Sequence, residues 1–304
     1  MADAATIENL NDAFGRPGAA RFEMRFGGPV ALLQHRGAAA VVALQGAQVL
    51  SYVPAGGEEV LWLSPVAQLS TAKAVRGGIP VCWPWFGPHP DGASKPAHGF
   101  VRAAPWQVIE TATDDLATRI TLRFDAATID PALWPHQAIA TLTAELASSL
   151  KITLETVNEG ANDISLSQAL HSYFAVGDVS RVVISGLNQR RYIDQLDRSA
   201  APVQSGEILI AAEVDRIYQD TADDVIIADA SSARAIKVAK SGSASTVVWN
   251  PWLEKGERLG DLGAGGHSRF VCIETANAGS DIQILRPGAR HSLVQEISTG
   301  PLLK

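Results

Sequence analysis

The sequence has few of the features that mark several large classes of protein. Its 304 residues contain two cysteines, Cys82 and Cys272, which form neither a CxxC motif nor a disulfide framework. Both lie in apolar segments, so we expect two buried thiols in a reducing compartment. Lysine and arginine number 25 against 32 aspartates and glutamates, and the net charge of −7 argues against a nucleic-acid partner.

Long apolar runs and leader segments are also missing. The most apolar stretch, 38–53, is interrupted by polar residues and is too short to span a bilayer. The N-terminal segment has neither the basic n-region nor the apolar core of a signal peptide. We therefore expect a soluble, cytoplasmic protein with no membrane partner.

Several catalytic motifs are absent as well. The sequence contains no G-x-x-x-x-G-K-[ST], no G-x-S-x-G and no H-E-x-x-H. The glycine-rich stretch 260–266 has no helical pattern after it, so it predicts a surface turn rather than a dinucleotide site. ATP chemistry, serine hydrolysis and zinc catalysis all lose support.

Alternation of apolar and polar residues recurs along the chain and predicts half-buried strands, for example at 22–26, 119–124 and 150–155. Residues 138–147 and 150–157 predict a long hairpin. Further short strands are expected at 60–63, 164–170, 181–185, 225–228, 234–239, 246–250, 269–275 and 281–285. Only 4–14 and 128–134 are candidates for short helices. The sequence therefore predicts an all-β fold, a large antiparallel sandwich or barrel. With no repeat or linker, it predicts one domain over 1–304, with roughly the first 15 residues peripheral.

One long segment, 73–106, interrupts the strand pattern. It holds six of the sixteen prolines together with Trp83, Trp85 and Trp106. A loop longer than about fifteen residues in a compact domain is usually functional or disordered. Its content of aromatic and branched apolar residues argues against disorder, so we expect an ordered functional loop.

Two polar residues stand at the ends of predicted strands. His171 has the parity of Ser165, Ser167 and Ala169, so it leaves the apolar face of its strand where small residues leave room. Glu274 shares the parity of Phe270 and Cys272, and its strand is apolar on both faces. By spacing alone, His171 could be a surface histidine and Glu274 a glutamate that reaches water. The functional alternative for Glu274 is a general base whose pKa is set by burial.

The loop and a later strand supply further candidates. Arg76 and Arg102 on one glycine-rich loop suit a phosphate dianion, because the guanidinium fork binds oxyanions bidentately. Each could equally be a loop arginine with a carboxylate partner. His98 could hydrogen-bond a sugar hydroxyl or be structural. For Asp215, spacing alone favours an aspartate in a turn or at a strand edge, beside Arg216.

These pieces occur in an order that resembles the aldose 1-epimerase superfamily and, within it, the glucose-6-phosphate 1-epimerase family. No single motif decides this, but seven in the right order are specific. The matching stretches are VLWLSPVAQ at 60–68, AVRGGIPVCWPWFG at 74–87, HGFVR at 98–102, LHSYF at 170–174, EVDRIY at 213–218, VVWNPWLEK at 247–255 and FVCIETAN at 270–277.

The resemblance implies a galactose mutarotase-like β-sandwich, an isomerase that needs no metal or organic cofactor, and a sugar phosphate as substrate. It implies that His171 is the general acid and Glu274 the general base of anomer exchange. It also implies that Arg76, His98, Arg102 and Asp215 bind the substrate, the arginines through the phosphate. We expect a monomer. The family more often has Thr where this chain has Ser172, and the loop 88–97 is individual, which bears on sugar selectivity.

Three alternatives remain at this point. The first is an epimerase of unphosphorylated aldoses, against which the two arginines argue. The second is a non-catalytic carbohydrate-binding sandwich in which tryptophans stack on sugar rings. The third, a purely structural β-domain, leaves the segment 73–106 unexplained.

Overall fold

The computed structural model describes residues 4–69, 73–89, 92, 95–199 and 201–302. Within these residues there are two α-helices and 22 strands. The helices are α1 (Ala4–Phe14) and α2 (Trp252–Leu259). The strands are β1 (Ala20–Arg25), β2 (Gly28–His35), β3 (Ala38–Ala43), β4 (Val49–Val53), β5 (Val81–Cys82), β6 (Gln107–Thr113), β7 (Thr118–Asp125), β8 (Ala138–Leu146), β9 (Leu150–Asn158), β10 (Ile164–Leu166), β11 (Gln168–Leu170), β12 (Tyr173–Ala175), β13 (Val182–Ser185), β14 (Tyr192–Asp194), β15 (Ile208–Leu209), β16 (Val214–Tyr218), β17 (Val225–Asp229), β18 (Arg234–Ser241), β19 (Ser245–Asn250), β20 (Phe270–Asn277), β21 (Gln283–Leu285) and β22 (Arg290–Pro301).

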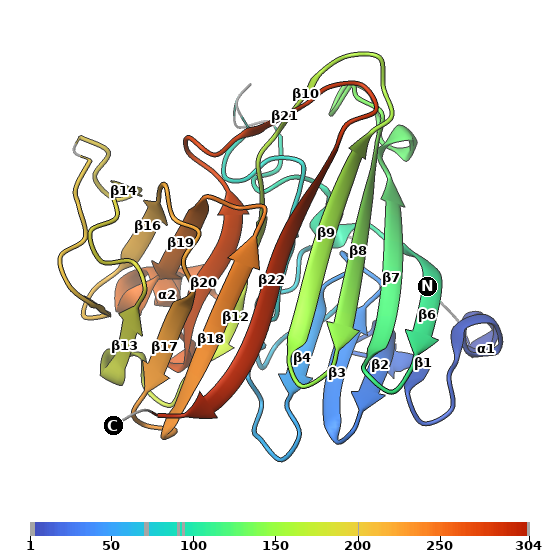
Figure 1. Ribbon diagram of the computed structural model, residues 1–304, viewed down its shortest axis with the longest axis horizontal. Coiled ribbons are helices and arrows are strands. Elements are labelled where there is room, and N and C mark those ends of the chain that lie inside the picture. The colour runs from blue at the N-terminus through green and yellow to red at the C-terminus, as the bar shows by residue number, and fades with distance from the viewer. Residues whose placement is uncertain (1–3, 70–72, 90–91, 93–94, 200, 303–304) are drawn as a thin grey trace.

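The strands form two layers of antiparallel sheet (Figure 1). One layer is a nine-stranded sheet in the order β15-β13-β17-β18-β22-β9-β8-β7-β6. The other layer holds two sheets side by side, the four-stranded β1-β2-β3-β4 and the seven-stranded β14-β16-β19-β20-β11-β5, in which β12 also pairs with β20. A short β10-β21 ribbon lies at one end. The predicted all-β sandwich is confirmed.

The main core lies between the two layers. The strands β7, β8 and β9 alternate buried and half-buried residues, as expected for a sheet with one face on the core and one toward water. This core cluster includes residues from Ala20 to Ile297. Packing of apolar side chains between the layers stabilises the fold by removing apolar area from water.

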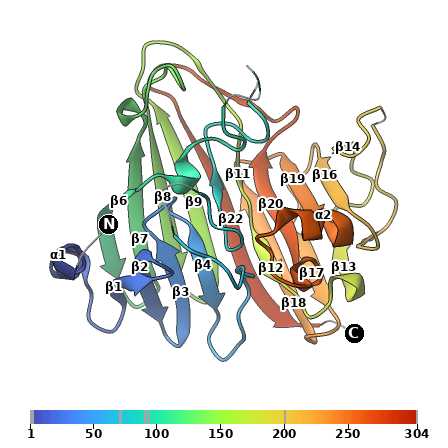
Figure 2. The same cartoon turned by 180° about the vertical axis from the view of Figure 1, so that it is seen from behind.

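The central strands β19 and β20 of the seven-stranded sheet are buried on both faces. All eight residues of β20 and all six of β19 are buried. Val248, Val271 and Ile273 point into the main core, whereas Val247, Trp249 and Cys272 join a second cluster on the outer face. Figure 2 shows α2 lying over this outer face, in front of β19 and β20.

Most strand predictions are confirmed, including the β8–β9 hairpin. The helix expected at 4–14 is also present. The prediction of a helix at 128–134 is wrong: a 3₁₀ turn at Ala126–Thr128 is followed by irregular chain, and Asp125 caps that turn by accepting from Ala127 N. Residues 60–63 form isolated bridges rather than a strand. The expected strand 164–170 is two strands in different sheets, β10 and β11, separated at Ser167. Sequence patterns missed α2, the longer strands β2, β3, β4, β6, β16 and β22, and the short strands β5, β12, β14 and β15.

A buried polar bridge joins the two layers beside the two strand-end candidates. Ser172, which follows His171, donates to Oε1 of Gln295 on β22 at 2.5 Å. Nε2 of Gln295 donates to Oγ1 of Thr275, the residue after Glu274, at 3.1 Å. Ser172 and Gln295 are fully buried and Thr275 nearly so. One glutamine of the nine-stranded sheet therefore links the neighbours of both candidates.

This bridge predicts an asymmetric effect of two serine-to-alanine substitutions. Ser172→Ala leaves the buried Gln295 carbonyl without its donor, so we expect the free energy of unfolding to fall by about 1–3 kcal/mol. Ser149 donates to Glu296 in a solvent-exposed hydrogen bond, so Ser149→Ala should change it by less than about 0.5 kcal/mol. Urea unfolding curves of both variants check this. Equal losses would contradict a stabilising role of the bridge.

Candidate functional site

The candidate residues gather on the outer face of the seven-stranded sheet. His171 directly follows β11, Glu274 lies in β20 and Asp215 lies in β16. The strand β19 separates the last two, with Glu274 opposite Val247 and Asp215 opposite Trp249. Because side chains of equal parity share a face, these pairings bring three residues from distant parts of the sequence to one surface.

His171 and Glu274 are in direct contact. Nε2 of His171 lies 3.3 Å from Oε1 of Glu274, and the two residues are 9% and 1% exposed. The alternatives of a surface histidine and a glutamate that reaches water are therefore wrong. Among the described residues, neither Nδ1 of His171 nor Oε2 of Glu274 has a hydrogen-bond partner. Two buried polar atoms are thus left to interact with a ligand.

Aromatic rings hold the His171 imidazole in place. It stacks on the Tyr173 ring, with centroids 4.9 Å apart and planes inclined by 10°. Trp249 and His98 approach it edge-on, each with a centroid separation of 5.9 Å. The ring is therefore fixed on three sides, which limits the ways in which it can face a ligand.

Burial sets the protonation of the pair. It raises the pKa of Glu274 well above its ordinary value, and the nearby Asp215 carboxylate raises it further. Burial also lowers the pKa of His171, and the positive charges of Arg102 and Arg76 act in the same direction. The pair therefore favours its uncharged form, in which Glu274 is a carboxylic acid and His171 is a neutral imidazole. In this form the pair holds one titrating proton, on Glu274.

His98 lies at the edge of the pair as a hydrogen-bond donor. Its Nδ1 accepts from Gly87 N at 3.3 Å, so in the neutral ring the proton is on Nε2. Burial lowers the pKa of His98 to about 3, and the charges of Arg102 and Arg76 add to that effect. The imidazole is thus neutral and presents one fixed N–H group.

Arg76 is positioned by two partners. Its Nε lies 3.1 Å from Oδ2 and 3.2 Å from Oδ1 of Asp261, and its Nη1 donates to the Tyr173 hydroxyl at 3.1 Å. The interpretation of Arg76 as a loop arginine with a carboxylate partner therefore holds, although its contact with Tyr173 also places it beside His171. Arg102 donates from Nη2 to the carbonyl oxygen of Ala97 at 2.6 Å.

The glycines after Arg76 are required by close packing. Gly78 has φ +61°, and a Cβ there would lie 2.2 Å from the carbonyl oxygen of Val49. Gly77 has φ +103°, and a Cβ there would lie 2.5 Å from the carbonyl oxygen of Trp62. Only glycine allows this segment to lie directly on its neighbours, and that approach brings Arg76 to Tyr173.

Asp215 carries a carboxylate that is costly to ionise. Burial raises its pKa to about 6, although Lys255 on α2 lies 3.8 Å away and opposes the shift. Lys255 also forms an ion pair with Glu213 at 2.6 Å. The expected partner, Arg216, points to the other face of β16 and lies 3.9 Å from Asp194 instead.

Sequence patterns missed Lys255 and Asp261 as parts of the site. The motif VVWNPWLEK, which ends at Lys255, was the available signal for the first. No pattern links Asp261 to Arg76, 185 residues earlier. The segment 88–97 is described only in part, so its effect on selectivity stays a prediction.

A cavity of about 280 Å³ lies on the same face, lined by residues that include Phe86, Pro88, Ser167 and Ile217. It is linked to the pair through Phe86, whose ring packs edge-on against His98 with centroids 5.0 Å apart. Neither His171 nor Glu274 is among the residues that line this cavity.

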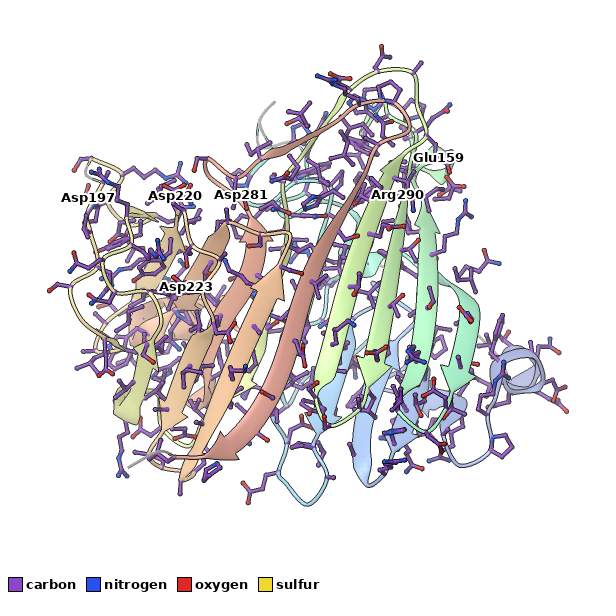
Figure 3. All side chains as sticks on the ribbon, viewed as in Figure 1. Glu159, Asp197, Asp220, Asp223, Asp281 and Arg290 are labelled. Atoms are coloured by element: carbon purple, nitrogen blue, oxygen red, sulfur yellow. The ribbon has the colours of Figure 1, made fainter. Side chains whose placement is uncertain are left out.

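Acidic residues elsewhere have structural partners. Figure 3 labels Asp197, Asp220, Asp223 and Asp281 on the loops at the ends of the strands. Asp223 pairs with Arg190, and Asp281 accepts from the side chain of Asn277. Asp223 thus has an ion-pair partner, and Asp281 has a hydrogen-bond donor.

Comparison with known proteins identifies the class of this chain. The family model for aldose 1-epimerase matches residues 29–298. The chain therefore belongs to the aldose 1-epimerase family, and the protein is an isomerase, a mutarotase or epimerase of sugars. No helix among the described residues is long and apolar enough to cross a membrane.

Relatives within the family are more specific in their names. The chain is 36% identical over 248 residues to a Salmonella typhimurium protein, and the match covers 81% of this chain and 82% of that one. It is 35% identical over 267 residues to an Escherichia coli protein, and that match covers 88% of each chain. Both carry the name "Putative glucose-6-phosphate 1-epimerase". The crystal structure of a mutarotase candidate from Salmonella typhimurium superposes with a TM-score of 0.86 at 32% identity, covering 93% of this chain and 94% of that one.

The buried carboxylate of Asp215 predicts a pH-dependent stability. The folded protein holds this proton to about pH 6, whereas an ordinary aspartate releases it near 3.8. Stability contributed by the protonated form is therefore present below about pH 4 and is lost as the pH rises toward 6. Asp215→Asn should raise the free energy of unfolding at pH 7 by on the order of 1–3 kcal/mol and leave it unchanged at pH 4.

Urea unfolding at pH 4 and pH 7 measures this difference, with Asp163→Asn as the exposed control. An Asp215→Asn variant that is less stable than the parent at pH 7 would show that Lys255 outweighs the cost of burial.

Proposed function

We propose that this protein is a hexose-6-phosphate mutarotase that interconverts α and β anomers, with glucose 6-phosphate as the expected substrate. The observation that carries the proposal is the contact between Glu274 and His171 on a face that also presents Arg76 and Arg102. An acid and a base in contact can transfer protons to and from one sugar, and two cations nearby suit a phosphate.

Anomer exchange requires two coordinated proton transfers. In ring opening, Glu274 as carboxylate takes the proton of the C1 hydroxyl while protonated His171 gives a proton to the ring oxygen. The C1–O5 bond breaks, C1 becomes an aldehyde, and rotation about C1–C2 exposes the other face of the carbonyl. On closure the roles reverse, so the enzyme ends with the protons that it began with.

The ligand-free pair holds the number of protons that this mechanism needs. One proton is shared, and burial places it on Glu274 rather than on His171. A sugar hydroxyl that donates to the unpartnered Oε2 of Glu274 favours the carboxylate, because a hydrogen bond to the charged form lowers a carboxyl pKa. Substrate binding would then move the proton toward His171, where the opening step uses it.

Neighbouring groups would orient the sugar. The neutral His98 offers an N–H donor, and Asp215 offers a carboxylate acceptor for sugar hydroxyls. Arg76 and Arg102 would hold the phosphate while the C1 end rotates, so binding energy far from C1 positions the reacting atoms. The names of the Salmonella and Escherichia coli relatives support the phosphorylated substrate.

The catalytic roles predict large losses on substitution. His171→Gln and Glu274→Gln should each lower kcat for glucose 6-phosphate by about 10²–10⁴-fold, because each removes one positioned proton transfer. Exchange NMR between the two anomers measures the rate after subtraction of the enzyme-free rate. His35→Gln and Glu110→Gln, made far from the site, are the matched controls and should retain the parent rate. Parent-like rates in both site variants would overturn the assignment.

The phosphate role predicts a change in selectivity. Arg76→Gln and Arg102→Gln should lower kcat/KM for glucose 6-phosphate by roughly tenfold or more while affecting glucose less, because only the phosphorylated sugar uses the charged contact. Asp261→Asn is the control for Arg76, since it removes the ion pair and keeps the guanidinium.

Two outcomes would favour the alternatives. Equal losses on glucose and glucose 6-phosphate would favour an epimerase of unphosphorylated aldoses. Sugar binding without anomer exchange in the parent protein would favour a carbohydrate-binding module.

A further inference from the structure

Cys272 adds a third metal-ligating side chain to the His171–Glu274 pair. It lies two residues before Glu274 on β20, so both side chains emerge on the outer face of the sheet. The candidate ligand atoms of His171, Cys272 and Glu274 all lie within 4.8 Å of one another. The three residues come from two neighbouring segments, which are held together by the Ser172–Gln295–Thr275 bridge.

The ligand set determines which ion fits. Thiolate and imidazole favour Zn²⁺ and its chemical relatives, whereas Mg²⁺ and Ca²⁺ prefer oxygen ligands alone. Zinc–ligand bonds of about 2.0–2.3 Å in a tetrahedron place ligand atoms roughly 3.3–3.8 Å apart. Separations of up to 4.8 Å therefore need to close by on the order of 1 Å when the ion binds.

Charge and unpartnered atoms also favour a cation at this position. A thiolate and a carboxylate together neutralise a dication, which lowers the cost of placing charge in a buried site. Oε2 of Glu274 and Nδ1 of His171 have no hydrogen-bond partner among the described residues. Three protein ligands leave the fourth zinc position for water or a sugar oxygen.

We propose that Zn²⁺ binds His171, Cys272 and Glu274 and reversibly inhibits the enzyme by occupying its acid and its base. The inhibition, but not the binding, rests on the proposed mutarotase function. Binding releases the Cys272 thiol proton, together with the proton held by the His171–Glu274 pair, to solvent. Zn²⁺ affinity therefore rises with pH.

The two cysteines of the chain provide a matched experiment. Cys82 is also buried and lies in the same outer-face cluster of apolar residues, but it is not one of the three candidate ligands. Co²⁺ is a spectroscopic probe of such a site, because its bond to a thiolate gives a charge-transfer absorption band. The parent and Cys82→Ser proteins should show this band and lose it on addition of Zn²⁺, whereas Cys272→Ser should not show it. Calorimetric titration with Zn²⁺ should give at least a tenfold weaker Kd for Cys272→Ser.

A second measurement separates binding from function. Zn²⁺ should slow anomer exchange by the parent and Cys82→Ser proteins, and a chelator should restore it. The exchange rate of Cys272→Ser, relative to its own metal-free rate, should respond at least tenfold less to the same Zn²⁺ concentration. If Cys272→Ser does not fold, His171→Gln replaces it in the Co²⁺ experiment and should weaken the band.

The results distinguish the two proposals. Absence of a thiolate band in the parent protein, or an identical band in Cys272→Ser, overturns the zinc site whatever the enzyme activity. A Cys272-dependent band in a protein that exchanges no hexose anomers supports the zinc site and overturns the proposed function.

Discussion

Burial of both faces of β19 and β20, the central strands of the seven-stranded sheet, is the constraint on which the candidate site depends. An ordinary antiparallel sheet turns one face to water, and a glutamate on that face would be ionised. Here α2 lies over the outer face, and Trp62 and Leu262 pack in the apolar cluster there. Glu274 is therefore 1% exposed, and the cost of burying its charge is met by retaining a proton. The same cover lowers the pKa of His171, so one structural feature prepares both members of the pair.

Buried groups of this kind need precise support, because a small displacement changes both the contact and the desolvation. The main-chain hydrogen bonds of β20 fix Glu274 in the sheet, but His171 follows a strand of only three residues. The additional support comes from the other layer, where Gln295 joins Ser172 to Thr275. The bridge uses the hydroxyl of Ser172, a group that threonine also carries.

The sequence predicted the fold class because alternation is strong where one face meets water, as in β7, β8 and β9. It missed β22, whose residues 290–301 mix polar and apolar side chains although the strand lies in the middle of the nine-stranded sheet. It predicted a helix at 128–134 and missed α2, because short helices depend on packing more than on pattern. Parity correctly placed His171 and Glu274 on faces of their strands. It could not bring them together, since the pairing of β11 with β20 joins segments about a hundred residues apart.

The arginines show why a residue can be identified correctly while its environment is not. Glycine and charge singled out Arg76, and a Cβ at Gly77 or Gly78 beside it would meet neighbouring backbone. These features did not predict Asp261, which already satisfies one edge of the guanidinium. A phosphate would therefore meet an oriented cation with its Nε–H occupied, rather than a free fork. The ion pair with Asp261 would lower the affinity of Arg76 for phosphate but fix the direction of its guanidinium. A fixed guanidinium suits a substrate whose phosphate must stay in place while its C1 end rotates.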